Sequence, residues 1–149
     1  MHWQEFDNPE KEKERLEKAL SENPADANAC YELGTVYAYV HDWATAKEFC
    51  DKAIGLDPKN ITYHACRSFV NSHLEEHGEA IEDLVTIIEL GGDESDYYVD
   101  VAQGAQRGMD KEYAVSRVVD LRKEGKDRIA GKLEEWLIKP FIYRRRIVT

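Results

Sequence analysis

A spacing of 34 residues recurs along this chain and constrains its fold more than any other feature. Ala46, Ala80 and Ala114 are separated by this interval, and so are Pro24 and Pro58. Apolar residues follow each alanine at fixed distances: Cys50, Leu84 and Val118 four residues later, and Ala53, Ile87 and Leu121 seven residues later. A period of this length indicates a repeat protein, in which each unit buries its apolar face only by stacking on its neighbours.

Within each unit, the apolar residues follow the three- and four-residue steps of an α-helix. In residues 27–40 this pattern is carried by Cys30, Leu33, Tyr37 and Val40. Residues that end helices interrupt the pattern at His41-Asp42, Asp57-Pro58, Gly91-Gly92, Gly108 and Gly125. The sequence therefore predicts three pairs of helices, at 27–40 and 43–56, at 61–74 and 77–90, and at 95–107 and 110–123.

One further helix is expected at each end of the repeats, because an uncapped terminal repeat would expose its core. Asn8-Pro9-Glu10 combines a capping residue, a proline and an acid, which predicts a helix over residues 9–22. Ile129, Leu133, Trp136 and Leu137 predict a closing amphipathic helix over residues 127–139. We expect one all-α domain made of an N-terminal helix (1–26), three repeats (27–60, 61–94 and 95–125) and a capping helix with a basic tail (126–149).

Residues 27–60 resemble a tetratricopeptide repeat (TPR). The family's Leu-Gly, Tyr, Ala, Ala and Pro pattern is matched by Leu33-Gly34, Tyr37, Ala46, Ala53 and Pro58. The second unit departs from this pattern at Arg67-Ser68 and Asn71, whereas the third keeps small residues at Ala102, Ala105 and Ala114. The resemblance covers about residues 27–125. It implies a right-handed α-solenoid of helix hairpins without catalytic activity, whose first helices line a concave groove for a peptide or another protein.

Aligning the repeats with this family places one set of side chains from each unit in the groove. They are Asn28, Tyr31, Thr35 and Tyr39, then Thr62, Ala65, Phe69 and His73, then Asp96, Val99, Gln103 and Arg107. Aromatic rings such as those of Tyr31 and Phe69 are natural anchors for a ligand, although both could instead cover the neighbouring core. Asp96 and Asp100 indicate a ligand with a basic segment at the third unit.

One well-known ligand of this family is not expected. The family's clamp for the C-terminal carboxylate of heat-shock chaperones consists of lysines and asparagines. Tyr31 and Thr35 stand where its first Lys and Asn would be, and no lysine is among the residues expected to line this groove. We therefore predict that the chain does not bind chaperone tails through such a clamp.

Two patterns could indicate a metal site, a redox site or catalysis. His73-Leu74-Glu75-Glu76-His77 fits the H-x-x-E-H motif of inverted zinc proteases. That motif needs one continuous helix, whereas Gly78 follows at once and His77 aligns with Trp43 at the start of a second helix, so the motif should span a turn. Cys30, Cys50, His64 and Cys66 could form a metal or redox cluster, but without a C-x-x-C motif we favour cysteines that pack as small apolar residues. We predict no metal, no cofactor and no enzyme activity.

The charge distribution bears on partners and location. The 149 residues carry a net charge of −10; residues 1–125 have 27 acidic and 13 basic side chains, and residues 126–149 have 3 and 7. An acidic body repels a phosphate backbone, so its main surface should not bind nucleic acid. There is no apolar run of the roughly 18–20 residues that span a membrane, nor a signal peptide's apolar stretch at the N-terminus. Three cysteines are too few for a disulfide framework, which favours the cytoplasm.

Two functions remain open at this point. The first is an adaptor that binds a protein or peptide segment in the concave groove. The second is a structural or self-assembling module that uses the closing helix and the tail, where Trp136, Phe141, Ile142 and Tyr143 lie beside the basic run Arg144–Arg146. For the tail itself we favour a segment that folds back on the acidic body or remains solvated over a docking or anion-binding element.

Overall fold

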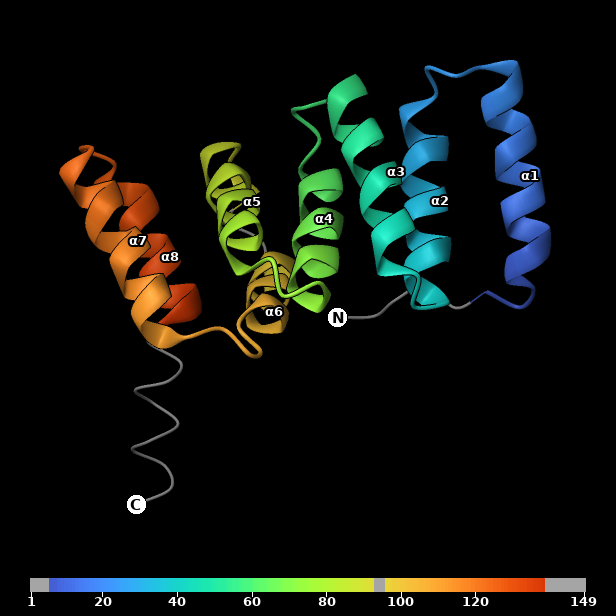
Figure 1. The fold of residues 1–149 in the computed structure, drawn as a ribbon. Helices are drawn as coiled ribbons and strands as arrows, with labels where there is room; N and C mark the ends of the chain where they lie inside the picture. The colour runs from blue at the N-terminus through green and yellow to red at the C-terminus, as the bar shows by residue number, and fades with distance from the viewer. Residues whose placement is uncertain (1–5, 93–95, 139–149) are drawn as a thin grey trace.

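The computed structural model describes residues 6–92 and 96–138, with residues 96–100 described by their backbone only. This part of the chain is all-helical, with no strand (Figure 1). Its helices are α1 (Pro9–Glu22), α2 (Ala27–Tyr39), α3 (Trp43–Leu56), α4 (Ile61–His73), α5 (His77–Glu89), α6 (Asp96–Ala105), α7 (Lys111–Lys123) and α8 (Asp127–Leu137). The predicted all-α class is therefore confirmed, and the predicted helices end within two residues of the observed ones. None of the helices in these ranges has the length and apolar character of a membrane span.

Short polar side chains set most helix starts. Asn8, Asp26, Asp42, Asn60 and Asp110 each precede a helix and accept a hydrogen bond from a backbone N–H two or three residues further on. Each such N-cap typically contributes about 1 kcal/mol, because it satisfies a donor that the helix leaves unpaired. The Asn and Asp residues that interrupt the apolar periodicity of the sequence thus cap the start of the next helix.

The turns inside the first two hairpins have the same geometry. His41 and Glu75 are 34 residues apart, and both have a positive φ, of 64° and 61°. The N–H of Asp42 bonds to the carbonyl of Tyr37, and the N–H one residue after Glu75 bonds to the carbonyl of Asn71, which closes each turn in a Schellman-like way. A β-carbon disfavours this left-handed conformation by roughly 1–2 kcal/mol. The conformational preferences of His41 and Glu75 therefore oppose the turns that they form.

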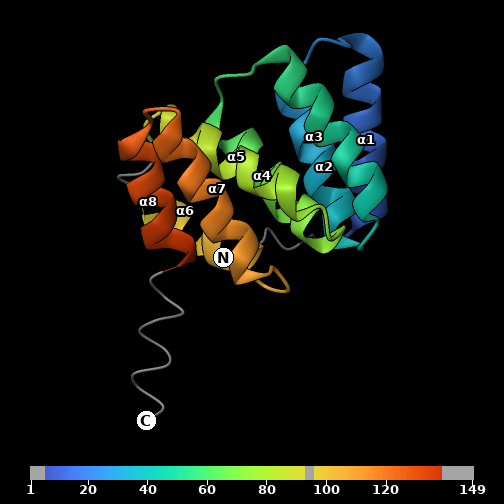
Figure 2. The same cartoon turned by 60° about the vertical axis from the view of Figure 1, so that its left-hand side comes forward.

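The first five helices pack in the order expected for an α-solenoid. α1 lies on α2, α2 pairs with α3, and α4 pairs with α5, while α3 also packs on α4 and joins the two hairpins. Figures 1 and 2 show these helices side by side in one row. Gly34 marks the close crossing of α2 and α3, since a β-carbon there would lie 3.1 Å from Cys50 Sγ and 3.4 Å from the Ala46 carbonyl oxygen. Leu16 is the buried anchor of α1, next to Leu33 and Val36 of α2.

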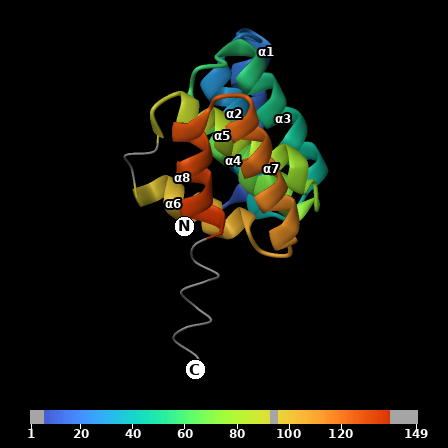
Figure 3. The same ribbon diagram turned by 90° about the vertical axis from the view of Figure 1, so that its left-hand side faces the viewer.

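The third unit differs from the predicted hairpin. Of the described helices, α6 lies against α4, α5 and α8, whereas α7 pairs with α8 instead of α6 (Figures 1 and 3). Gln106, just after α6, donates a hydrogen bond to the carbonyl of Leu137 in α8. A hairpin of α6 and α7 alone would leave the apolar stripe of α8 exposed, and placing α8 beside both buries all three stripes in one core. The closing helix is therefore part of the third unit, not a lid beyond it.

Candidate functional site

A pocket of about 490 Å³ lies where the C-terminal ends of α4 and α6 meet the turn between α4 and α5. Its lining consists of Phe69, Ser72, His73, Glu75, His77, Gly104, Arg107 and Gly108. Three of these, Phe69, His73 and Arg107, are among the residues that the repeat alignment places in the groove. The structure thus brings predicted groove residues of the second and third units to one hollow.

Two rings that line this pocket, those of Phe69 and His73, belong to a cluster of four packed rings. The indole of Trp43, the first residue of α3, lies parallel to the imidazole of His73, with centroids 3.9 Å apart and an interplanar angle of 2°. Phe69 meets both rings edge-on, at 4.6 Å from His73 and 5.8 Å from Trp43. His41, in the turn before α3, adds a fourth ring 5.4 Å from Trp43. These contacts support Phe69 and His73 from the neighbouring hairpin.

The charges around the pocket are mixed. Burial lowers the pKa of His73, and its electrostatic interactions with His41 and Arg107 lower it further, so the neutral imidazole is favoured. Nδ1 of His77 is buried and has no hydrogen-bond partner among the described residues. Gly108, with φ of 75°, passes close to this ring, since a β-carbon there would lie 3.9 Å from His77 Cε1. The pocket therefore offers apolar ring faces, the guanidinium of Arg107 and the carboxylate of Glu75.

The H-x-x-E-H motif spans a turn, as predicted. α4 ends at His73 and α5 begins at His77, with Glu75 in the left-handed conformation between them. The two histidines are therefore not one turn apart on a continuous helix, as the zinc motif requires. Within residues 6–92 and 96–138, no group of three or more His, Cys, Asp and Glu side chains is placed to hold a metal ion.

The other predicted groove residues lie apart from this pocket. Tyr31 stacks on Tyr63 with centroids 5.2 Å apart, and Tyr39, 40% exposed, meets Phe6 edge-on at 5.5 Å. Asn28 is exposed and donates to Glu32 on its own helix. Thr62 is half-buried and Gln103 is exposed. The side chains of Asp96, Val99 and Asp100 lie outside those described.

Two of the predicted groove residues have almost no surface to offer. Thr35 is 4% exposed and its hydroxyl donates to the carbonyl of Glu32, while Ala65 is 2% exposed. The reason is that α4 lies against both α2 and α6, so neighbouring first helices close over the positions between them. The prediction that Thr35 and Ala65 line a groove is therefore wrong.

The closing segment also differs from its predicted surface role. Trp136 is 2% exposed and belongs to the largest core cluster, with Leu133 and Leu137. It therefore offers no surface for contact between copies while α8 stays in place. Phe141, Ile142, Tyr143 and the basic run Arg144–Arg146 lie outside the described residues.

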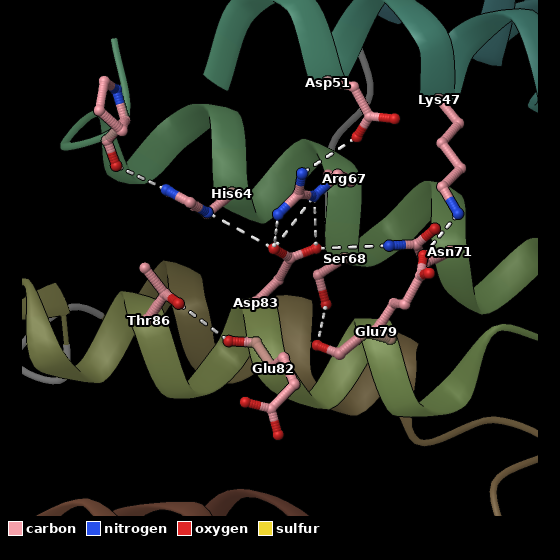
Figure 4. Close-up of polar contacts among 12 residues, drawn as sticks. Lys47, Asp51, His64, Arg67, Ser68, Asn71, Glu79, Glu82, Asp83 and Thr86 are labelled. Carbon is pink, nitrogen blue, oxygen red and sulfur yellow. Dashed lines mark hydrogen bonds and ion pairs between the residues drawn. The ribbon is translucent and has the colours of Figure 1, made fainter. Parts of the chain in front are cut away.

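A buried polar network between α3, α4 and α5 was not predicted (Figure 4). Its centre is the carboxylate of Asp83, 2% exposed. Arg67 donates to it from Nε and Nη2 at 2.7–3.2 Å, and Asn71 Nδ2 lies 3.4 Å away. Arg67 also reaches Asp51 of α3 at 3.0 Å. Burial acts against the charge on Arg67, but these two carboxylates outweigh it and raise the guanidinium pKa.

Repeat alignment explains where this network comes from. In the first unit the equivalent positions hold Leu33, Gly34, Tyr37 and Phe49, and the last two stack with centroids 5.6 Å apart. In the second unit they hold Arg67, Ser68, Asn71 and Asp83. The Ser68 hydroxyl donates to the Ala80 carbonyl at 3.1 Å across the α4–α5 crossing, which is equivalent to the α2–α3 crossing at Gly34. The departures of the second unit from the TPR pattern thus replace apolar packing by one polar network. These departures are the sequence feature from which the network could have been predicted.

The three cysteines are buried free thiols, as favoured from sequence. Cys30 packs with Ala53, Ile54 and Tyr63. Cys50 and Cys66 belong to a different core cluster and face each other with their sulfur atoms 3.3 Å apart. The two belong to different hairpins, so no local pattern in the sequence indicates this contact.

Comparisons with known proteins bear on the fold. No protein-family model and no curated protein matches this chain. Among solved structures, the crystal structure of MamA, a TPR-like protein, matches with a TM-score of 0.53 and 15% identity over 96% of this chain and 99% of that chain. The chain has a TPR-like helical fold. At this identity the likeness concerns the fold alone.

Proposed function

We propose that this chain is a non-catalytic protein-interaction module that binds a segment of a partner protein at the pocket between α4 and α6. The observation that supports this proposal most is the pocket itself, because Phe69, His73 and Arg107 converge there from two repeats. Large rings and arginines contribute most to binding energy at protein interfaces. We also propose the cytoplasm as its location, on the basis of its few unpaired cysteines.

The rings and Arg107 suggest what the partner segment presents. An apolar or aromatic side chain would lie against Phe69, and an acidic or carbonyl oxygen of the partner would meet the guanidinium of Arg107. A basic segment further along the ligand, expected from Asp96 and Asp100, remains a prediction. It is consistent with the strongly acidic body, which would attract a cationic peptide.

A random-sequence peptide display library tests this proposal. Peptides enriched on the full chain are measured by fluorescence anisotropy against the wild type, Phe69→Ala and Arg107→Ala. We expect at least about 10-fold weaker binding for each pocket variant. Because Phe69 also contacts Trp43 and His73, circular dichroism must show unchanged helix content, and the exposed Arg107 provides a variant that leaves the core intact.

The matched control is Val119→Ala, which removes an exposed apolar side chain from α7, away from the pocket. This variant should bind the enriched peptides like the wild type. Equal affinity of all three variants, or no peptide that binds the wild type, would contradict the proposal. Basic residues among the enriched peptides, and weaker binding at higher salt, would support the expected basic segment.

A further inference from the structure

Cys50 and Cys66 are placed to react with each other. Cys50 lies on α3, the second helix of the first hairpin, and Cys66 on α4, the first helix of the second hairpin. Their sulfur atoms are 3.3 Å apart. A disulfide bond is about 2.05 Å long, so bond formation requires the two sulfur atoms to approach by only about 1.3 Å.

The surrounding core holds Cys50 against its neighbour. Its sulfur lies 3.1 Å from where a β-carbon on Gly34 would stand, so α2 leaves it no room on that side. Ala38, Ala46 and Val70 complete the cluster around both thiols. Cys30 belongs to another cluster, with Ala53 and Tyr63. The chain thus contains one facing pair of thiols and one separate thiol.

We propose that Cys50 and Cys66 form a redox pair that a peroxide converts into a disulfide joining the first hairpin to the second. Cys66, 5% exposed against 1% for Cys50, is the thiol that the oxidant reaches first. The Cys66 thiol gives up its proton, its sulfur attacks one peroxide oxygen and the O–O bond breaks. Cys66 becomes a sulfenic acid, and the hydroxide that leaves takes up that proton as water. The sulfur of Cys50 then attacks the sulfenic sulfur, and the hydroxyl leaves as a second water with the proton of the Cys50 thiol. Two thiols and one hydrogen peroxide thus give one disulfide and two waters.

The environment makes Cys50 the second thiol to react. The hydrogen bond with Cys66 and burial raise the pKa of Cys50, so it carries little thiolate at neutral pH. Burial of both sulfurs also means that oxidation proceeds through brief local opening of the α3–α4 contact. The disulfide therefore forms more slowly than an exposed thiol is oxidised, which suits a response to sustained oxidation. Disulfides are rare in reducing compartments, and those that form there are usually transient.

The disulfide would fix α3 relative to α4, the helix that carries the pocket residues Phe69 and His73. Trp43, the first residue of α3, stacks on His73, the last residue of α4, so the same two helices also meet beside the pocket. In a solenoid, each interface between neighbouring units contributes to the stability of the whole array. A covalent bond at this interface prevents the hairpins from separating. This inference does not depend on whether the pocket binds a peptide.

Peptide mapping of the full chain tests the pair directly. The folded protein is treated with hydrogen peroxide, remaining thiols are blocked with N-ethylmaleimide, and the protein is digested without reductant. We expect a linked peptide pair containing Cys50 and Cys66, with Cys30 alkylated. Dithiothreitol should reverse the link. Oxidation in guanidinium, where the fold is absent, should instead give mixed pairings that include Cys30.

Thermal unfolding gives a second, independent measurement. The disulfide closes a loop of about 16 residues and should raise Tm by roughly 5–10 °C. Cys30→Ser should retain both the link and the shift, whereas Cys66→Ala, treated identically, should lose both and so controls for methionine oxidation. Sulfinic or sulfonic acids at residues 50 and 66, intermolecular dimers, free thiols at both positions, or linkage of Cys30 in the folded protein would each overturn the proposal.

Discussion

The indole of Trp43 and the imidazole of His73 lie parallel, 3.9 Å between centroids and 2° between planes, across the boundary of two hairpins. This contact joins the start of α3 to the end of α4, and it places the rings beside the pocket lined by Phe69 and Arg107. Packing between repeats and the shape of the candidate site therefore depend on the same side chains.

The histidines of α4 should give opposite pH dependences of stability. Burial, with His41 and Arg107, lowers the pKa of His73 in the folded state. Its contribution is therefore present above the unfolded pKa of about 6.5 and is lost as pH falls through the folded pKa. The hydrogen bond to Asp83 raises the pKa of His64, so its contribution is present below about 6.5 and is lost as pH rises through the folded pKa.

Urea unfolding of the wild type, His73→Gln and His64→Gln between pH 5 and 8 measures both effects. The stability advantage of the wild type over His73→Gln should grow with pH. Its advantage over His64→Gln should shrink with pH. The same trend in both comparisons would show that at least one of these two environments is wrongly described.

Loss of the Asp83 carboxylate should be among the most damaging single changes in this chain. Asp83→Ala leaves the half-buried guanidinium of Arg67 without its main partner and should cost about 3–5 kcal/mol of unfolding free energy. Asp51→Ala removes only the exposed partner of Arg67 and should cost less than about 1 kcal/mol. Chemical denaturation checks both, and similar losses for the two would argue against Asp83 as the centre of the network.

Replacing the whole network should be far less costly than breaking it. The combined change Arg67→Leu, Ser68→Gly, Asn71→Tyr and Asp83→Phe copies the apolar residues of the first repeat into the second. Because buried ion pairs can be replaced by apolar packing at little or no cost, this protein should be more stable than Asp83→Ala, despite carrying three further substitutions. A less stable quadruple variant would mean that the two hairpins cannot share one packing.

The turn residue Glu75 should favour glycine. Its φ of 61° is strained for a residue with a β-carbon, so Glu75→Gly should raise the unfolding free energy by up to about 1 kcal/mol, once the greater chain entropy of unfolded glycine is counted. The converse control is Gly125→Ala, which places a β-carbon at φ of 78° after α7 and should destabilise by about 1 kcal/mol. Thermal unfolding distinguishes these opposite signs.

The closing helix should matter as much as a repeat. Leu133→Ala empties a fully buried position in the core that α8 shares with α7 and should cost about 2–5 kcal/mol. Leu56→Ala, at an exposed leucine, should change stability by less than about 0.5 kcal/mol. If both changes were mild, α8 would be a loosely attached cap.

The sequence by itself determined the helices, because their signals are local. Periodic apolar residues, N-caps such as Asp42 and stops such as Pro58 act within a few residues, so the 34-residue period predicted both the helices and their order. It also placed Phe69, His73 and Arg107 on faces that meet at the pocket. The same alignment failed at Thr35 and Ala65, because burial depends on how closely neighbouring helices pack.

Only the tertiary structure decided which distant side chains meet. Asp83 opposite Arg67, Cys50 opposite Cys66 and α8 beside α6 all join segments whose pairing no local pattern records. These contacts depend on which apolar stripes and buried charges find partners once the helices are stacked. A repeat pattern determines the helices of each unit. The arrangement of α6, α7 and α8 is instead set by the free energy gained when their apolar faces are all buried together.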